Sequence, residues 1–263
     1  MGNQIRLGAL ISGGGTNLQA ILDACESGAI SATVAFVGSD NPGAYGLERA
    51  ASRRIPTFVV DYRSILRAYR EAPESVRVPE DFDFDDIVRK QAFFGPETDS
   101  RRIKAFLITR AVAEARLLDA IAPYAIDLLV LAGFMRNLTP YFIDRFNTGP
   151  AHPRIMNIHP ALLPAFPGVD GYGDTFRYGC KVGGCTVHFV DYGEDSGPII
   201  GQKSFQITNR DTLDSVKQRG LAQEWELYPE CIQLFAENRL KTVRMTYPLE
   251  GGGEIQRVVV RIE

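Results

Sequence analysis

Two polar side chains in the stretch NIHPALLPAFPG, residues 157–168, have the types and spacing needed for chemistry on a carbonyl group. Asn157 and His159 are two residues apart, so they project from the same face of a strand, which Pro160 would end. Asn can donate two hydrogen bonds to an oxyanion without carrying charge, and His gains or loses a proton near neutral pH. The pattern predicts a catalytic pair; a rigid turn that carries polar residues is the alternative.

A carboxylate beside His159 would raise the pKa of the imidazole and fix its orientation. Asp195 is the candidate partner, because it lies in a loop between two glycines of VHFVDYGEDSGPII, residues 187–200. We expect His188 to be structural, since it lies in mid-strand among apolar residues, and His152 to lie at the surface.

The glycine-rich stretch SGGGTN, residues 12–17, has the composition of a phosphate-binding loop between a strand and a helix. Glycines let the backbone turn sharply and let a ligand approach it, and the following helix offers free N–H groups at its positive end. The amides around Gly15, Thr16 and Asn17 would hold the phosphate with the Thr16 hydroxyl. The stretch matches neither the dinucleotide fingerprint nor the Walker pattern. A tight turn with Thr16 or Asn17 as helix N-cap therefore stays open.

A second candidate binding stretch is LAGFMR, residues 131–136, at the end of the most apolar strand. Gly133 would give a ligand access to backbone N–H and C=O groups, which could pair with a flat heterocycle. Arg136 adds a charge just outside the core. A strand end followed by a solvated Arg is an equal alternative.

Strands and helices alternate along the chain around these stretches. Apolar runs that read as strands are residues 5–12, 32–40, 56–61 and 126–134, followed by RIMNIHP, CTVHFVDYG and GPIIGQKSFQI. Helical patterns occupy residues 18–28, 44–54, 105–124 and 212–238. This alternation predicts an α/β fold with a mostly parallel sheet and helices on both faces. Ligands of such sheets bind at the carboxyl ends of the strands, where the unusual residues gather.

The composition is that of an ordinary globular protein of 263 residues, with 45% hydrophobic and 23% charged residues. A net charge of -3 gives no reason to expect nucleic acid as a partner. The beginning lacks the pattern of a signal peptide, and no apolar run approaches the length of a membrane span. Four scattered cysteines, two of them in CKVGGC, fit neither a disulfide scaffold nor a metal site. We therefore expect a cytoplasmic protein with reduced thiols and no membrane partner.

The ordered set ISGGGTNLQAIL, LAGFMR, NIHPALLPAFPG and GCTVHFVDYGEDSGPII resembles the phosphoribosylglycinamide formyltransferases, the folate-dependent glycinamide ribonucleotide transformylases of purine synthesis. The resemblance covers most of the chain apart from one internal segment and about the last twenty residues. It implies a Rossmann-like formyltransferase fold, in which 10-formyltetrahydrofolate as cosubstrate gives its formyl group to the amine of glycinamide ribonucleotide without a metal.

The resemblance also assigns roles to residues of this chain by their match to the family's motifs. The catalytic trio corresponds to Asn157, His159 and Asp195. The nucleotide side corresponds to Gly15, Thr16 and Asn17 for the phosphate and to Glu224, in QEWELYP, for the ribose. The folate side corresponds to Phe134, Met135, Arg136 and Asp191.

The implied reaction agrees with the chemistry of these side chains. Attack of an amine on a formyl carbon creates an oxyanion, which Asn157 and protonated His159 could both stabilise. Asp195 would keep the imidazole charged and could order a water that carries the proton to the leaving nitrogen.

The sequence departs from the family in four places. A charged segment at about 64–104 is longer than the usual connection, and either Arg63 or Arg67 could be the Arg that reaches the phosphate. The stretch 169–184 lacks the family's His after PG, so this wall of the site is expected to be rebuilt. The family's Glu-His pair is Glu224-Trp225 here. The last residues, about 240–263, read as a hairpin with a glycine turn, an added edge strand to a single domain spanning 1–263.

Other functions share parts of this pattern. A formyltetrahydrofolate deformylase uses similar Asn, His and Asp residues but has no need of a phosphate loop. A methionyl-tRNA formyltransferase would need a basic domain for RNA. A non-catalytic folate-binding module is the third alternative. The sequence favours small-molecule partners and leaves the oligomeric state open.

Overall fold

The computed structural model describes residues 4–148 and 153–263, and His152 lies outside them. The strands are β1 (Ile5–Ile11), β2 (Ala32–Ser39), β3 (Thr57–Val59), β4 (Leu128–Leu131), β5 (Ile155–His159), β6 (Val182–Phe189), β7 (Ile199–Gln206), β8 (Leu240–Pro248) and β9 (Glu254–Ile262). The helices are α1 (Thr16–Glu26), α2 (Gly46–Ala51), α3 (Tyr62–Glu71), the 3₁₀ helix η1 (Pro73–Ser75), α4 (Phe84–Lys90), α5 (Ser100–Ile121), α6 (Pro140–Phe146), α7 (Gly171–Arg177) and α8 (Leu213–Ala236).

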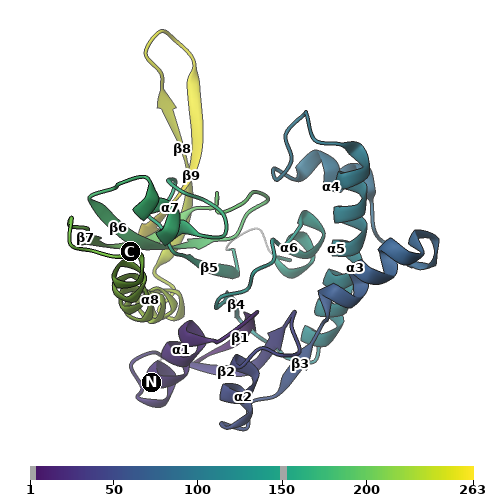
Figure 1. Ribbon diagram of the computed structural model, residues 1–263, viewed down its shortest axis with the longest axis horizontal. Helices are drawn as coiled ribbons and strands as arrows, with labels where there is room; N and C mark the ends of the chain where they lie inside the picture. Colours follow the sequence, from purple (N-terminus) through teal and green to yellow (C-terminus); the bar gives the residue numbers. More distant parts are fainter. Residues whose placement is uncertain (1–3, 149–152) are drawn as a thin grey trace.

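The main sheet has the order β3-β2-β1-β4-β5-β6-β7, with helices around it (Figure 1). In this order the first five strands, β3, β2, β1, β4 and β5, pair in parallel. β6 is antiparallel to β5, and β7 is antiparallel to β6. The expected α/β fold with a mostly parallel sheet is confirmed. Because β6 is antiparallel to β5, Asn157 and His188 are direct partners in the register.

Alternating residues of the central strands face two separate hydrophobic clusters. Leu7 and Val130 pack in a cluster with α1 and α8 on one face of the sheet. Leu10 and Leu129 pack in a second cluster with α3, α5 and α6 on the other face. Every other residue of a strand points to the same side, so each central strand contributes to both cores.

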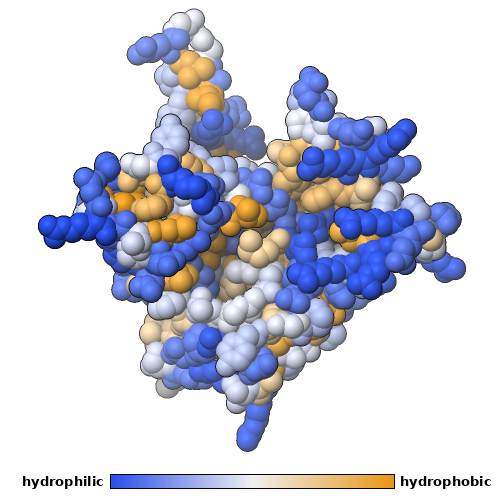
Figure 2. All heavy atoms as spheres, in the orientation of Figure 1, coloured by the Kyte–Doolittle hydropathy of each residue, from blue (hydrophilic) through white to orange (hydrophobic). Residues whose placement is uncertain are grey.

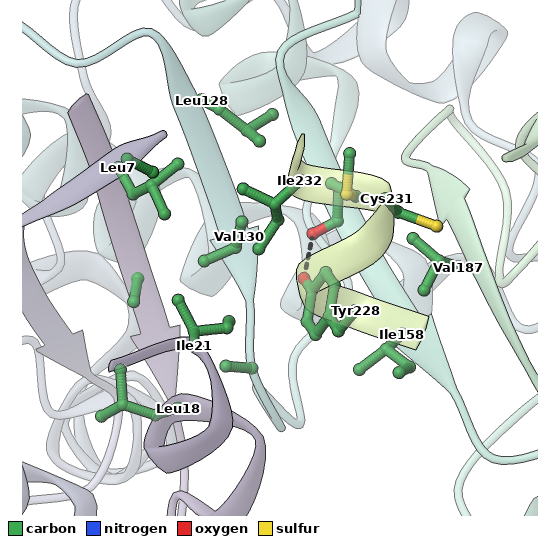
Figure 3. Packing of buried hydrophobic residues seen from close by; sticks show 14 of the residues in the cluster. Leu7, Leu18, Ile21, Leu128, Val130, Ile158, Val187, Tyr228, Cys231 and Ile232 are labelled. Atoms are coloured by element: carbon green, nitrogen blue, oxygen red, sulfur yellow. Dashed lines mark hydrogen bonds between the residues drawn. The ribbon is translucent and has the colours of Figure 1, made fainter. Parts of the chain in front are cut away.

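Helix α8 is fixed to the middle of the sheet by a fully buried tyrosine. Figure 3 shows Tyr228 among the apolar side chains of α1, β4 and α8. Its hydroxyl donates to the Met156 carbonyl at 2.8 Å and lies 3.2 Å from the Leu131 carbonyl. A buried phenol needs such partners, and here they set the position of α8 beside the carboxyl ends of β4 and β5.

Residues 60–99 connect β3 to α5 and contain the helices α3, η1 and α4. Short helices form here because Asp61 and Asp83 cap α3 and α4 with their side chains. Ile87, which is only 3% exposed, packs near Phe82 against a cluster that includes Leu107 of α5. Part of this connection therefore belongs to the core, although its charged composition is typical of a surface segment.

The C-terminal hairpin forms as expected but does not join the main sheet. β8 and β9 make a separate two-stranded antiparallel sheet that projects from the body (Figure 1). Gly251, Gly252 and Gly253 all have positive φ in the turn, a conformation that glycine adopts without strain. The expectation of an added edge strand is wrong. Figure 2 shows hydrophobic atoms along the projecting hairpin, among hydrophilic ones.

Within residues 4–148 and 153–263, no helix is both long and apolar enough to span a membrane.

Candidate active site

The residues singled out from the sequence surround one pocket of about 560 Å³ at the carboxyl ends of β1, β4 and β5. Each of them lines it: Gly15, Thr16, Asn17, Phe134, Met135, Arg136, Asn157, His159, Asp191, Asp195 and Glu224. Parallel strands end at the same edge of a sheet, so stretches far apart in sequence meet there.

The start of α1 presents backbone N–H groups to the pocket. Gly15, with φ 69°, is the N-cap residue, and no side chain caps the helix. The alternative in which Thr16 or Asn17 is the N-cap is therefore wrong. A Cβ on Gly15 would lie 2.9 Å from the Gly46 Cα, so only glycine fits this turn. Uncapped N–H groups at the positive end of a helix are suited to an anion.

Asn17, Glu224 and Tyr172 form a buried polar chain across one wall of the pocket. The Asn17 amide donates to Glu224 Oε2 at 2.6 Å, and the Tyr172 hydroxyl donates to Glu224 Oε1 at 2.6 Å. Burial raises the pKa of Glu224, and the two donated hydrogen bonds oppose that shift. The Asn17 side-chain oxygen Oδ1 is buried and has no hydrogen-bond partner in the protein, so it can accept a hydrogen bond from a ligand.

Tyr172 was not predicted as a site residue. It lies on α7, in the stretch 169–184 that departs from the family, and it lines the pocket. A Cβ on Gly220 would lie 2.1 Å from the Tyr172 ring, so the glycine inside α8 makes room for that ring. Gly220, in a stretch with a helical pattern, was the one signal in the sequence for a close approach at this point.

His159 is nearly buried, and both of its ring nitrogens face acceptors. Nδ1 lies 3.1 Å from Asp195 Oδ2, and Nε2 lies 2.8 Å from the Phe166 carbonyl. Burial opposes the charged imidazole, but the hydrogen bonds and charge of these partners raise the pKa of His159 overall. A ring that donates from both nitrogens is the imidazolium, so the geometry favours the protonated form.

Asp195 is held from several directions. Its backbone has φ 50°, a conformation that L residues other than Asn and Asp rarely adopt. Oδ2 accepts a hydrogen bond from the Gly168 amide at 2.8 Å in addition to facing His159. Burial would raise the pKa of Asp195, but the hydrogen bond and charge of His159 and the hydrogen bond from the Gly168 amide hold it well below its usual range. The carboxylate therefore stays charged beside the imidazole.

His188 lines the same pocket beside this centre, although its position in mid-strand predicts a structural residue. Its Nε2 lies 3.2 Å from Asn157 Nδ2 and 3.6 Å from Asp195 Oδ1. Its Nδ1 lies 2.9 Å from the Phe189 carbonyl, which makes Nδ1 the donor and leaves Nε2 to accept from Asn157. The residue is buried in mid-strand as expected, but the antiparallel register turns it toward Asn157.

The loop after β4 forms the opposite wall. The Ser12 hydroxyl accepts from the Met135 amide at 2.8 Å, which ties this loop to the glycine-rich loop. The Arg136 guanidinium donates to buried Asp40 at 2.5 Å, so its charge is fixed at the rim of the pocket. Met135 is 56% exposed and available to a ligand, whereas Phe134 is mostly core.

Several other candidates lie elsewhere. Neither Arg63 nor Arg67 is among the residues that line the pocket, and both are exposed on α3. Of the CKVGGC pair, Cys185 is buried in the core. Among the described residues no group of three or more His, Cys, Asp or Glu side chains could hold a metal ion.

This pocket belongs to a known class of enzyme. The model of the formyl transferase family matches residues 5–232, and the chain is a member of that family.

Individual relatives narrow the class further. The phosphoribosylglycinamide formyltransferase of Haemophilus influenzae is 35% identical over 240 residues, which cover 90% of this chain and 89% of the relative. The phosphoribosylglycinamide formyltransferase of Escherichia coli is 34% identical over 232 residues, which cover 88% of this chain and 87% of the relative. The crystal structure of glycinamide ribonucleotide transformylase 1 from Symbiobacterium toebii matches with a TM-score of 0.72 and 37% identity. That match covers 100% of this chain and 95% of the other.

Proposed function

We propose that this chain transfers the formyl group of 10-formyltetrahydrofolate to the amine of glycinamide ribonucleotide, a step of purine synthesis. The observation that carries the proposal is the meeting, in one pocket, of an uncapped helix start and an Asn, His and Asp centre. The relatives named phosphoribosylglycinamide formyltransferase, matched over most of their length, support the same activity. In this reading the chain is a transferase with two small-molecule substrates, and we propose a cytoplasmic location.

The nucleotide would bind along the wall formed by α1 and α8. Its phosphate fits the N–H groups of Gly15, Thr16 and Asn17, which carry the positive end of the helix dipole. Glu224, next to Asn17, offers a carboxylate that can only accept hydrogen bonds, which suits the ribose hydroxyls. The amine would then point toward the centre of the pocket.

The folate would bind on the side of the loops after β4 and β6. Open space beside Gly133 and the exposed Met135 side chain leave room here for the pterin, and Arg136 supplies a positive charge near the rim. Asp191 shapes the second loop, because its carboxylate accepts from the Gly193 amide at 3.1 Å and the Ser196 hydroxyl at 2.6 Å. We therefore assign Asp191 to the shape of the folate pocket.

The reaction forms one bond and breaks another. The amine attacks the formyl carbon, and the oxygen of the tetrahedral centre takes up negative charge. The bond from that carbon to the folate nitrogen then breaks, and the proton lost by the amine passes to this nitrogen. Asp195, which holds a charge in the pocket, is the group that would orient a water for this transfer.

Stabilisation of the oxyanion requires an exchange of hydrogen bonds. His159 Nε2 faces the Phe166 carbonyl, and the Asn157 amide faces His188 and Asp195. An oxyanion is a stronger acceptor than a neutral carbonyl, so it would replace these partners at Nε2 and at the amide.

Direct assay separates this function from its nearest alternative. The purified chain is mixed with both substrates, and formyl transfer is followed by absorbance, with a parallel reaction that lacks the nucleotide. Consumption of formyl folate only when the nucleotide is present is the expected result. Equal consumption without it would mean that the chain is a deformylase, a function for which the uncapped start of α1 has no use.

A further inference from the structure

The long connection between β3 and α5 contacts the loop that carries Asp195, residues 190–198. The backbone N–H of Ala92 donates to the Tyr192 carbonyl at 2.9 Å. A Cβ on Gly193 would lie 3.6 Å from the Ala92 Cβ, so the two segments are in van der Waals contact.

A second contact runs through α6. Lys90 Nζ lies 2.8 Å from Asp144 Oδ2, and the Tyr192 hydroxyl donates to the other oxygen of the same carboxylate. Lys90 also pairs with Asp86 at 2.7 Å. The hydrogen bond that Lys90 donates to Asp144 raises the pKa of Lys90, so the ammonium is charged at neutral pH. These side chains are about one-third exposed or less, so the contact acts mainly by fixing geometry and adds little to stability.

The residues that present Ala92 are themselves fixed. The Gln91 side chain accepts from the backbone amides of Phe93 at 2.8 Å and Phe94 at 3.0 Å. The Phe94 ring packs edge-on against Phe106 of α5, with ring centroids 5.1 Å apart. The donor that reaches Tyr192 therefore comes from a segment anchored on the core.

The loop held in this way forms one wall of the pocket. Gly193, Glu194 and Asp195 all line the pocket, next to Tyr192. Glu194 accepts from Asn137 at 3.2 Å, which ties the loop to the stretch after β4. A shift at Tyr192 would move both the folate wall and the carboxylate that faces His159.

We infer that the connection at 60–99 positions the Asp195 loop, and that Lys90 and Ala92 are its positioning residues. The kinetic consequence rests on the proposed function, because it concerns the binding of formyl folate and the proton on His159. The contact itself is independent of that function.

Two variants test the inference. Ala92→Pro removes the N–H donor and places the ring Cδ toward the Tyr192 carbonyl. Gln91, at φ -68° and ψ 147°, already has the extended conformation that a residue before proline prefers. Lys90→Met removes the ammonium but keeps the aliphatic stem. Arg89→Met is the matched control, since Arg89 lies on the same helix, pairs with Asp86 and is 73% exposed.

Two measurements distinguish positioning from a merely structural role. We expect faster hydrogen exchange in residues 190–198 in Ala92→Pro and Lys90→Met but not in Arg89→Met. We also expect the KM for formyl folate to rise about three- to tenfold, with the KM for the nucleotide unchanged, as for loss of one hydrogen bond. The alkaline limb of the rate profile should shift to lower pH, because Asp195 would hold the His159 proton less well.

The outcomes are separable from those of the proposed function. Wild-type protein that transfers no formyl group would refute the proposed function, whereas the exchange experiment would still test the contact. Unchanged exchange in both variants overturns the inference, and so does faster exchange with unaltered KM and pH profile. If Ala92→Pro fails to fold, Lys90→Met against Arg89→Met decides between the same outcomes.

Discussion

Asp195→Asn is the most direct test of the ion pair between Asp195 and His159. In the wild type, Oδ2 accepts from both Gly168 and His159, while Oδ1 faces Asn157 and His188. An asparagine can keep its carbonyl oxygen in the first position and direct its NH₂ group at His188 Nε2, which is an acceptor. Asn also tolerates the positive φ of this residue. The variant therefore loses the charge and the weak 3.5 Å hydrogen bond from Asn157, and otherwise retains the geometry.

The size of the effect follows from the contact that is weakened. A hydrogen bond to a charged group contributes about 1.5–3 kcal/mol, and one pKa unit corresponds to about 1.4 kcal/mol. The pKa of His159 should therefore fall in the variant. Weaker stabilisation of the oxyanion, by about 1.5–3 kcal/mol, should lower kcat by about ten- to 150-fold, with little change in the affinity for either substrate.

The pH dependence has a definite sign. The pKa of His159 is raised in the native protein, and the active form is protonated, so activity is lost as pH rises through that pKa. Without the carboxylate this loss should occur at lower pH. Steady-state rates across pH give one measurement, and NMR titration of the imidazoles gives another, since the chain has only three His residues. Asp174→Asn, on the surface of α7, is the control for loss of a carboxylate.

Three results would refute this reasoning. Near-normal turnover of Asp195→Asn would mean that Asp195 merely forms the turn. An unchanged titration of His159 would mean that the carboxylate does not govern the proton. Fully additive losses in the double variant with His159→Ala would mean that the residues act independently, whereas we expect the double variant to be little worse than the poorer single one.

Three further changes test other parts of the site and the core. Gly14→Asp, where a Cβ meets nothing within 4 Å, should raise the KM for the nucleotide more than tenfold (about 1.4 kcal/mol) by repelling the phosphate. Gly14→Asn should have a smaller effect, and equal effects in steady-state assays would contradict the phosphate assignment. Tyr172→Phe removes the donor to Glu224 and should raise the same KM by about tenfold with a smaller change in kcat, and an unaltered KM would show that the hydroxyl is dispensable. Burial raises the pKa of Glu114 to about 7, so folding stability should fall as pH rises from about 5 to about 8. Thermal melts of Glu114→Gln should lack this fall in stability. A pH dependence equal to that of the wild type would refute the assignment of the fall to Glu114.

The fold and the outline of the site could be predicted because their signals are local. Buried strands appear as apolar runs, and SGGGTN marks the point where a strand turns into a helix. Asn157 and His159 could be paired because strand periodicity puts residues two apart on one face. The common pocket then follows from the rule that parallel strands end at one edge of the sheet.

Contacts between distant segments could not be predicted from the sequence. Tyr172 reaches Glu224 from 52 residues away, and no motif in the stretch around it marks the contact. The position of His188 beside Asn157 could not be predicted, because it depends on the register of an antiparallel neighbour, which apolar flanking residues do not reveal. The connection at 60–99 looks superficial by charge, yet Ile87 is buried because α5 and α6 offer it an apolar surface.

The placement of Asp195 shows how such long-range contacts create the chemistry. Five neighbouring strands run in parallel and bring the glycine-rich loop at residues 12–17 and Asn157 to one edge of the sheet. None of these strand ends supplies the carboxylate of Asp195. The antiparallel pair β6 and β7 supplies it through a loop that returns over β5, and such a loop has no helix to fix it. Its position must therefore come from contacts on every side, from His159 and Gly168 at the carboxylate, Asn137 at Glu194 and the β3–α5 connection at Tyr192. A charge that is to hold a proton on a buried imidazole must stay within hydrogen-bond distance of it. The contacts around this loop are thus as much a part of the proposed catalytic centre as Asn157, His159 and Asp195 themselves.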